Sequence, residues 1–258
     1  MDRIKKFPPL YIYLLLTLMY LPIILIAVYS FNASESFAAW GGFTMDWYGK
    51  LIKDEDLLDS LIVSLKVAGL SALISAALGT VGAVSMDAMS KKAATLVTGL
   101  AYAPLVVPEV IMGVALMLFL SISPISFGIP AMILSHTTFC IPYVMIMVNI
   151  RLKAIEPAIF EAARDLGAGR LMIFRTITLP LILPGIITGA LLAIAMSMDD
   201  IIISFFLTGP RDTSLPVRIY SMLKLGVSPD INALCTLMLL FTFGVVAVLQ
   251  VMRVNKRT

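Results

Sequence analysis

The chain has 258 residues, of which 60% are hydrophobic and only 14% are charged, and its mean hydropathy is +0.99. Soluble domains carry about 25% charged residues, so this composition excludes a water-soluble globular protein and predicts an all-α integral membrane protein. A net charge of +3 is too small to indicate a protein that binds nucleic acid.

Six apolar runs are each long enough to cross the hydrocarbon core of a membrane, which takes about 20 helical residues. The first run is longer than the core of a signal peptide, so we expect a retained anchor helix. The sequence therefore predicts a single transmembrane domain over residues 1–258, with the anchor at 10–31 and the remaining spans within 60–252. The predicted spans are 10–31, 61–84, 95–120, 129–150, 181–207 and 233–252.

Most of the 19 basic residues collect in alternate connections between these spans. Lys and Arg are enriched on the cytoplasmic side of membrane proteins, so both termini are predicted to be cytoplasmic. The opposite side carries a loop with acidic residues at 54–56 and 59 and with aromatic residues that suit either interfacial anchors or substrate contacts. The basic residues on the predicted cytoplasmic side are Arg3, Lys5, Lys6, Lys91, Lys92, Arg151, Lys153, Arg164, Arg170, Arg175, Arg253, Lys256 and Arg257.

The second predicted span carries small residues at every fourth position, in two adjacent rows. Small side chains let helix backbones approach closely in lipid, so these rows predict a helix contact. The rows are Ser64, Ala68, Ala72, Ala76 and Thr80, and Ser71, Ser75, Gly79 and Ala83.

The connection between the fourth and fifth spans, residues 151–180, has clear local signals. Proline is favoured at the first position of a helix and glycine just past its end, so Pro157 and Gly167 predict a short helix over 157–166. A second helix is predicted over 171–177, ending before Leu179 and Pro180. Together they predict an elbow outside the membrane, on its positive side.

This elbow resembles the E-A-A loop of importer-type ABC permeases. Glu161, Ala162 and Ala163 are followed after three residues by Gly167 and, after nine further intervening residues, by the sequence Ile-Thr-Leu-Pro at 177–180. The resemblance implies a six-helix type I ABC importer fold in which Glu161, Ala162, Ala163, Asp165 and Gly167 form a coupling helix that docks on an ATPase subunit.

No phosphate-binding loop is present, because the only Gly-Lys pair lacks the glycine that such a loop requires upstream. We therefore expect a non-catalytic translocation subunit with no cofactor or metal of its own. ATP and magnesium would be used by a separate ATPase.

Three acidic residues fall inside predicted spans: Glu109, Asp199 and Asp200. A buried acid costs about 2.5 to 3.5 kcal/mol on insertion scales, so each needs a reason to be there. Counted along the helices, Glu109 and Asp199 reach similar depths of roughly 21 and 27 Å and are predicted to share one layer that attracts a cation. Pairing with a basic residue or capping of a broken helix is the alternative. Pro104 and Pro108 predict a bent helix beside Glu109.

Several further stretches resemble the PotC-type permeases of spermidine/putrescine importers: 29–32, 47–48, 135–140, 197–200, 208–210 and 219–234. The resemblance implies a polyamine cargo and a location in a bacterial inner membrane. The implied partners are a PotB-like permease, a PotA-like ATPase dimer and a PotD-like binding protein. It also implies a substrate path at Trp47, Glu109, Ser197, Asp199 and Asp200, where Glu109 replaces the aspartate that is frequent in the family.

His136, the only histidine, lies within the fourth span and is predicted to be a neutral, hydrogen-bonded side chain rather than a proton relay. Three alternatives to a polyamine importer remain. One is an ABC importer of another solute, such as an iron chelate or an oxyanion. Another is an ion-coupled secondary transporter, although no inverted repeat is found. A third is a membrane scaffold without transport activity.

Overall fold

The computed structural model describes residues 7–34, 39–86, 89–210, 212–225 and 229–254. Most of these residues lie in helices, and turns and short loops connect them. An isolated antiparallel β-bridge joins Asn32 to Phe43. The chain divides into a terminal unit, Met1–Leu58 with Ile219–Thr258, and a central unit, Asp59–Arg218. The predicted cytoplasmic residues Arg3, Lys5, Lys6, Lys256 and Arg257 lie outside the described residues, as does segment 226–228 of the PotC-type resemblance.

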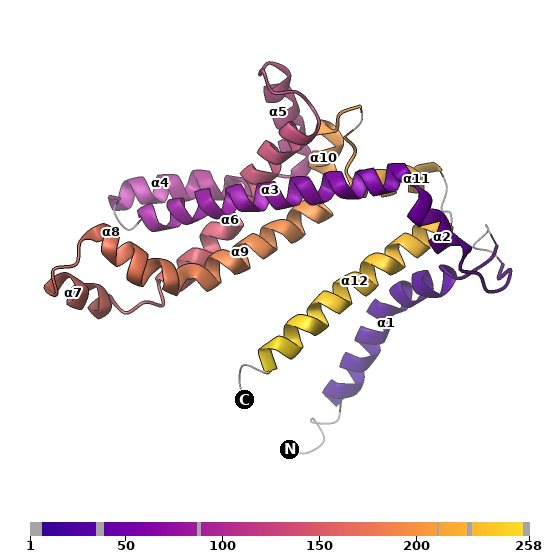
Figure 1. Ribbon diagram of the computed structural model, residues 1–258, viewed down its shortest axis with the longest axis horizontal. Helices are drawn as coiled ribbons and strands as arrows, with labels where there is room; N and C mark the ends of the chain where they lie inside the picture. Colours follow the sequence, from indigo (N-terminus) through magenta and orange to yellow (C-terminus); the bar gives the residue numbers. More distant parts are fainter. Residues whose placement is uncertain (1–6, 35–38, 87–88, 211, 226–228, 255–258) are drawn as a thin grey trace. The chain divides into compact units, whose positions relative to one another are not determined.

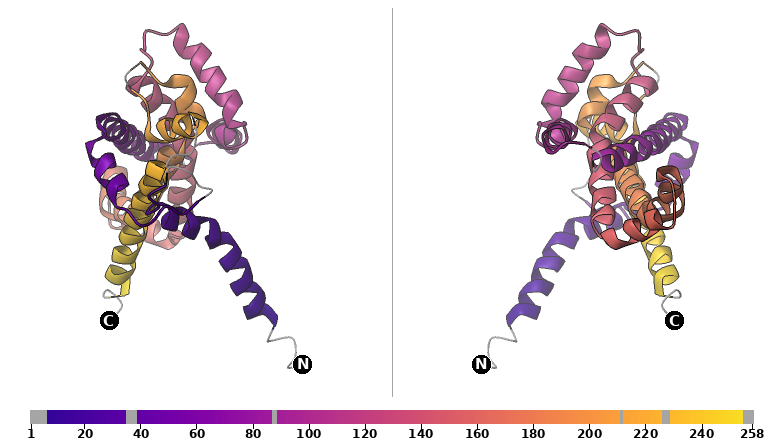
Figure 2. Two further views of the ribbon diagram at one scale, coloured as in Figure 1. Left: turned by 90° about the vertical axis from the view of Figure 1, so that its right-hand side faces the viewer. Right: turned by 90° about the vertical axis from the view of Figure 1, so that its left-hand side faces the viewer.

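In the terminal unit, α1 (Phe7–Tyr29) and α2 (Asp46–Lys53) both pack against α12 (Pro229–Val254). Figure 2 shows that α1 and α12 diverge toward the two chain ends. The described side chains of α1 are mostly exposed, Leu18 by 71%, as expected for a helix that faces lipid. Helices α3 (Glu55–Met86) and α11 (Leu215–Leu225) pass from one unit to the other.

The central unit is built around α6 (Ile129–Leu152) and α9 (Leu179–Asp199), which pack along each other. Two glycines of α9 permit this contact: a Cβ atom at Gly189 would lie 2.8 Å from the Cα of Val144, and one at Gly185 would lie 2.8 Å from the carbonyl oxygen of Met147. Helix α9 runs from the α8 side of the central unit to the α10 side (Figure 1). The other elements of this unit are α4 (Lys91–Tyr102), η1 (Ala103–Leu105), α5 (Glu109–Ser121), α7 (Pro157–Asp165), α8 (Arg170–Ile173), the π-helical turn η2 (Phe174–Thr178) and α10 (Ile202–Leu207).

One small-residue row of α3, with Ser71, Ser75 and Gly79, faces α6, which confirms the predicted helix contact for that row. The hydroxyl groups of Ser71 and Ser75 donate hydrogen bonds to carbonyl oxygens of α6, each at 3.2 Å. A Cβ atom at Gly79 would lie 2.8 Å from the side chain of Val144. Close backbone approach therefore replaces large apolar side chains at this contact.

Among the described residues, four helical stretches are long and apolar enough to cross a membrane: Tyr11–Tyr29, Glu55–Met86, Ile129–Leu152 and Arg170–Asp199. The predicted third span is divided between Lys91–Leu105 and Glu109–Ser121, which meet at an angle of 104°. The described apolar part of α12, Pro229–Gly244, is shorter. Four of the six predicted spans therefore overlap these stretches, and the bend expected from Pro104 and Pro108 in the third span is confirmed.

Two boundary predictions were wrong. The second helix of the 151–180 connection does not end before Leu179 and Pro180, because the π-helical turn η2 carries the chain directly into α9. A wide turn of this kind accommodates the missing N–H of Pro180 without a break. The fifth predicted span, 181–207, is not one helix, because the extended backbone at Asp200 separates α9 from α10.

Candidate substrate pocket and coupling elbow

The break between α9 and α10 is held by the side chain of Asp200. Its Oδ1 atom accepts a hydrogen bond from the N–H of Ile203 at 3.2 Å, and its Oδ2 atom accepts from the N–H and the hydroxyl of Ser204 at 2.7 and 2.8 Å. The N–H groups of Ile203 and Ser204 lie in the first turn of α10, where they have no partner within the helix. A carboxylate is well suited to cap such groups. The alternative that one of the three acids caps a broken helix therefore holds for Asp200.

His136 of α6 joins this break from the opposite side. Its Nε2 atom lies 3.3 Å from Oδ2 of Asp200 and 3.1 Å from the hydroxyl of Ser204. Its Nδ1 atom lies 2.6 Å from the hydroxyl of Ser197 on α9. The predicted hydrogen bonding of His136 is confirmed, while its neutral form stays a prediction.

The second break, between α4 and α5, positions Glu109. The short helix η1 contains Pro104, and Pro108 stands in extended backbone immediately before α5. Neither ring nitrogen can donate to a helix ladder, so the chain turns here and restarts at Glu109. The Glu109 carboxylate lies in the first turn of α5, where the positive end of the helix dipole stabilises a negative charge.

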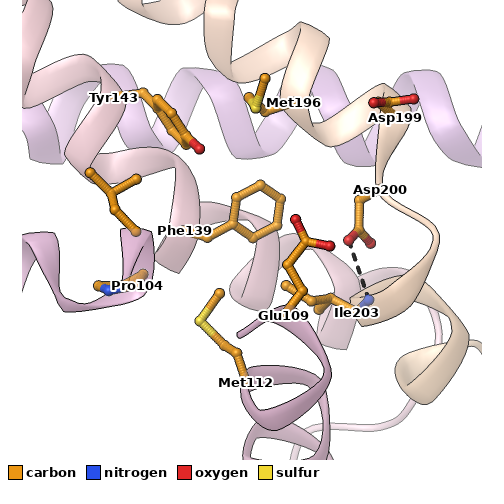
Figure 3. A pocket seen from close by; sticks show the side chains of 10 residues that line it. Pro104, Glu109, Met112, Phe139, Tyr143, Met196, Asp199, Asp200 and Ile203 are labelled. Atoms are coloured by element: carbon orange, nitrogen blue, oxygen red, sulfur yellow. Dashed lines mark hydrogen bonds between the residues drawn. The ribbon is translucent and has the colours of Figure 1, made fainter. Parts of the chain in front are cut away.

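The two breaks meet at one pocket, whose volume is about 140 Å³. Glu109 points from α5 toward Asp200, with the ring of Phe139 beside it (Figure 3). Among the described residues, neither Glu109 nor Asp199 has an ion pair or a side-chain hydrogen bond, and both are exposed, whereas Asp200 is only 9% exposed. The pocket is lined by Pro104, Leu105, Glu109, Met112, Phe139, Tyr143, Met196, Asp199, Asp200 and Ile203.

The five residues of the predicted substrate path are thus distributed over three places. Glu109, Asp199 and Asp200 line the pocket. Ser197 is buried and directed at His136 instead. Trp47 belongs to the terminal unit, where its indole N–H donates to the carbonyl oxygen of Asn32 at 2.8 Å and the ammonium group of Lys50 lies 4.2 Å from its ring centroid.

Two aromatic pocket residues, Phe139 and Tyr143, were not predicted from the sequence. They follow His136 on α6 at spacings of three and seven residues, which places all three on one helix face. That spacing was a usable signal, because it extends the face marked by a buried histidine. Among the described residues, no group of three or more His, Cys, Asp or Glu side chains is placed to hold a metal ion.

The coupling elbow, residues 156–168, has a defined backbone. The first helix is α7, which begins at Pro157 and ends at Asp165, so the prediction is confirmed to within one residue. Its end is closed by two hydrogen bonds, from the N–H of Gly167 to the carbonyl oxygen of Arg164 and from the N–H of Ala168 to that of Ala163. This pattern requires a left-handed residue, and Gly167 has φ +80°.

The alanines of the elbow differ in their surroundings. Ala163 is buried against its own chain, whereas Ala162 and the acidic residues Glu161 and Asp165 are exposed. Leu166 is 88% exposed. The elbow therefore presents a small residue, two carboxylates and a large apolar side chain on its outer surface.

Apolar helices, a pocket whose Glu109 and Asp199 have no partner among the described residues, and an exposed elbow between two helices are features that suit a membrane transport permease. The chain belongs to the family of binding-protein-dependent transport system inner membrane components, which it matches over residues 76–257. It is therefore a multi-pass membrane protein, and the family resemblance stated from the sequence is confirmed.

Two relatives from Escherichia coli strain K12 cover most of the chain. The spermidine/putrescine transport system permease protein PotC is 37% identical over 238 residues, which are 92% of this chain and 90% of that protein. The putrescine transport system permease protein PotI is 40% identical over 232 residues, 86% of this chain and 82% of that protein.

The fold is shared with a chain from a bacterial ABC transporter involved in the import of the acidic polysaccharide alginate. The TM-score is 0.71 at 22% identity, and the match covers 98% of this chain and 95% of that one. The predicted fold of an ABC importer permease is therefore confirmed.

Proposed function

We propose that this chain is the translocating permease subunit of an ATP-driven importer for spermidine and putrescine in a bacterial inner membrane. The observation that carries this proposal is the pocket in which two helix breaks bring together Glu109 and Asp199, both without a partner in the part of the chain that the structure describes. Charged groups are kept in membrane proteins where they act on a substrate or an ion. The names of the PotC and PotI relatives support the same cargo.

The chemistry of the pocket suits an aliphatic polyamine. Its carboxylates can accept hydrogen bonds from ammonium groups, while Phe139, Met112 and Met196 offer apolar contacts to the methylene chain between them. The Tyr143 ring can add attraction to a cation, worth about 0.5 to 2 kcal/mol. A volume of about 140 Å³ is close to that of an engineered cavity of about 150 Å³ that binds benzene. It therefore suits a short diamine or one end of a longer polyamine.

The alternatives are less well supported. An oxyanion site requires positively charged or N–H donor groups, and the described lining contains no Lys, Arg or His. A pocket of this size that is lined by carboxylates favours a small cation, and an iron chelate is larger and carries less positive charge. Membership in a binding-protein-dependent family argues against a self-contained secondary transporter and against a scaffold without transport activity.

The coupling elbow supports an ATPase partner. The Leu166 side chain is almost fully exposed, so it contributes little to packing within the described chain. It can bury its apolar surface in a cleft of another subunit. Glu161 and Asp165 can pair with basic groups around such a cleft. The proposed complex contains a PotB-like second permease, a PotA-like ATPase dimer that uses ATP and magnesium, and a PotD-like binding protein.

In this proposal, closure of the ATPase dimer moves the coupling elbow, and α9 transmits that movement because α8 and η2 join the elbow to it. The pocket at the other end of α9 then changes its exposure, accepts cargo from the binding protein and releases it inward. Both termini are placed in the cytoplasm on the side of Lys91, Lys92, Arg151 and the elbow, following the distribution of basic residues.

The experiment measures uptake of labelled spermidine and putrescine by the complete complex in proteoliposomes. ATP is supplied on the side of the vesicle membrane that the ATPase subunits face. Unlabelled diamines and triamines should compete, and arginine and lysine should compete far less. If the complex transports another solute and no polyamine, the cargo assignment is wrong, while the family membership is unaffected.

A further inference from the structure

We propose that His136 is a positioning residue of the transport path: by holding Asp200 at the break between α9 and α10, it keeps the neighbouring Asp199 facing the pocket. The inference rests on the proposed function, because Asp199 is assigned there to the cargo. It concerns a residue that is not among those that line the pocket.

Burial and connectivity single out this histidine. His136 is 1% exposed, and its two ring nitrogens link α6 to Ser197 on α9 and to Ser204 on α10. These three helices all contribute residues to the pocket lining, and they are joined through one ring. An imidazole kept only as an apolar filler would not have partners at both nitrogens, and deep burial makes each of these hydrogen bonds strong.

The hydrogen bonds also determine where a proton must lie. Ser204 has a single hydroxyl hydrogen, which it donates to Oδ2 of Asp200. The hydroxyl can therefore only accept from His136, and a carboxylate 3.3 Å away also requires a donor. Nε2 of His136 must carry a proton, and it is shared between Ser204 and Asp200. In the neutral ring Nδ1 then accepts from Ser197.

This arrangement divides the predicted substrate path into two groups. Four donors surround the Asp200 carboxylate, from Ile203, Ser204 and His136, so its oxygens have little remaining capacity for cargo. Ser197 faces His136 rather than the pocket. Ser197 and Asp200 thus act through the ring of His136, whereas Asp199 and Glu109 have no side-chain partner within the described part of the chain and can receive an ammonium group.

Three substitutions separate positioning from packing. His136→Phe keeps a ring of similar size but removes both hydrogen bonds. His136→Gln can place an amide N–H near the position of Nε2, so it keeps a donor for Asp200. His136→Asn is too short to reach Asp200. Thr138→Val on the same helix is the control, because its hydroxyl bonds only to the carbonyl oxygen of Leu134.

The first test is nuclear magnetic resonance of the complete complex with ¹⁵N-labelled histidine. The His136 signal is the one missing when the subunit carries His136→Gln, because the chain has a single histidine. We expect a protonated Nε2 whose signal shifts in Asp200→Asn and stays unchanged in Thr138→Val. An unprotonated Nε2, or a His136 chemical shift that is the same in Asp200→Asn and in the wild type, would contradict the proposed hydrogen bonds between His136 and Asp200.

The second test is the apparent KM for polyamine uptake, with ATPase turnover and subunit recovery measured on the same samples. His136→Phe should raise KM at least fivefold, and His136→Gln should remain within twofold of the wild type. In an Asp199→Asn background, His136→Phe should add less than a further twofold. Equal values for Phe and Gln, or a fully multiplicative effect with Asp199→Asn, would contradict positioning.

If His136→Phe does not assemble, His136→Asn takes its place, with the same expected rise in KM relative to His136→Gln. Wild-type complex that transports no polyamine would instead overturn the proposed function. In that case the resonance experiment still decides whether His136 holds Asp200.

Discussion

The coupling elbow and the acidic pocket lie at the two ends of the same helix, α9, but they are constructed by different means. The elbow is local: Pro157 starts its helix, Gly167 ends it, and its hydrogen bonds join residues that are close in the sequence. The pocket depends on residues up to about a hundred positions apart, brought together by two helix breaks. One region works through backbone shape and the other through unpaired charge, so substitutions should affect them differently.

The largest effect is expected from removing charge in the pocket. Asp199→Asn keeps the size of the side chain but loses a charged acceptor, which is worth about 1.5–3 kcal/mol in a hydrogen bond. Polyamine uptake should fall about tenfold or more, while the complex still assembles and retains basal ATPase activity. Asp59→Asn removes an exposed carboxylate outside the pocket lining and should leave uptake near the wild-type rate. Equal uptake by the two variants would show that the charge of Asp199 is not needed for polyamine transport.

The connection between the two regions can be loosened at the contact of α9 with α6. Gly189→Ala places a Cβ atom against the backbone of Val144, and overpacking of this kind costs about 1–3 kcal/mol. The thermal unfolding midpoint of the purified complex should fall by several degrees. Gly99→Ala is the matched control, because a Cβ atom there meets open space and alanine favours a helix. A midpoint that falls equally in both variants would show that the close approach of α9 and α6 is not what matters.

At the elbow, the decisive feature is the left-handed conformation of Gly167. Gly167→Ala introduces a Cβ atom that costs about 1–2 kcal/mol in this conformation, although nothing lies within 4 Å of it. Recovery of the ATPase subunit with the permease should drop several-fold, and uptake should drop with it. Gly169 has φ −70° and equal free space, so Gly169→Ala should have no effect. Undiminished recovery with Gly167→Ala would contradict the docking assignment.

The smallest effect is expected at the aromatic wall of the pocket. Tyr143→Leu removes ring attraction to an ammonium group, worth about 0.5–1 kcal/mol where the site is partly solvated, so the apparent KM should rise roughly two- to fivefold. Tyr143→Phe keeps the ring and should stay close to the wild type. If Tyr143→Phe has the larger effect, the hydroxyl group rather than the ring contacts the cargo.

The difference between the regions also explains what could be predicted from the sequence. Hydrophobic run lengths, the Pro157 and Gly167 signals and the small residues of α3 are encoded within a few turns of the chain, and they predicted most of the helices and the contact of α3 with α6. The continuity of α9 through Pro180 was missed, because a π-helical turn has no simple sequence signal. The break at Asp200 was foreseen only as an alternative, that one of the three acids caps a broken helix, because it depends on a capping side chain that is held by a distant histidine.

The candidate site was only partly accessible for the same reason. Glu109 and Asp199 were placed in one layer by counting residues along two helices, and the structure brings both into one pocket. Ser197 and Trp47 came from a family resemblance, which transfers positions but not their contacts. Phe139 and Tyr143 required knowledge of which face of α6 looks into the pocket, and that is decided by packing against α9.

The most direct measurement of the central claim is photo-crosslinking of the complete complex during turnover with a polyamine that carries a photoactivatable diazirine. If the carboxylates of the pocket receive the cargo, peptide mapping will find the label within residues 104–112, 139–143 and 196–203, which line the pocket, and excess spermidine will suppress it. Labelling of this chain that leaves all three segments unmodified, or that persists in excess spermidine, would contradict the account.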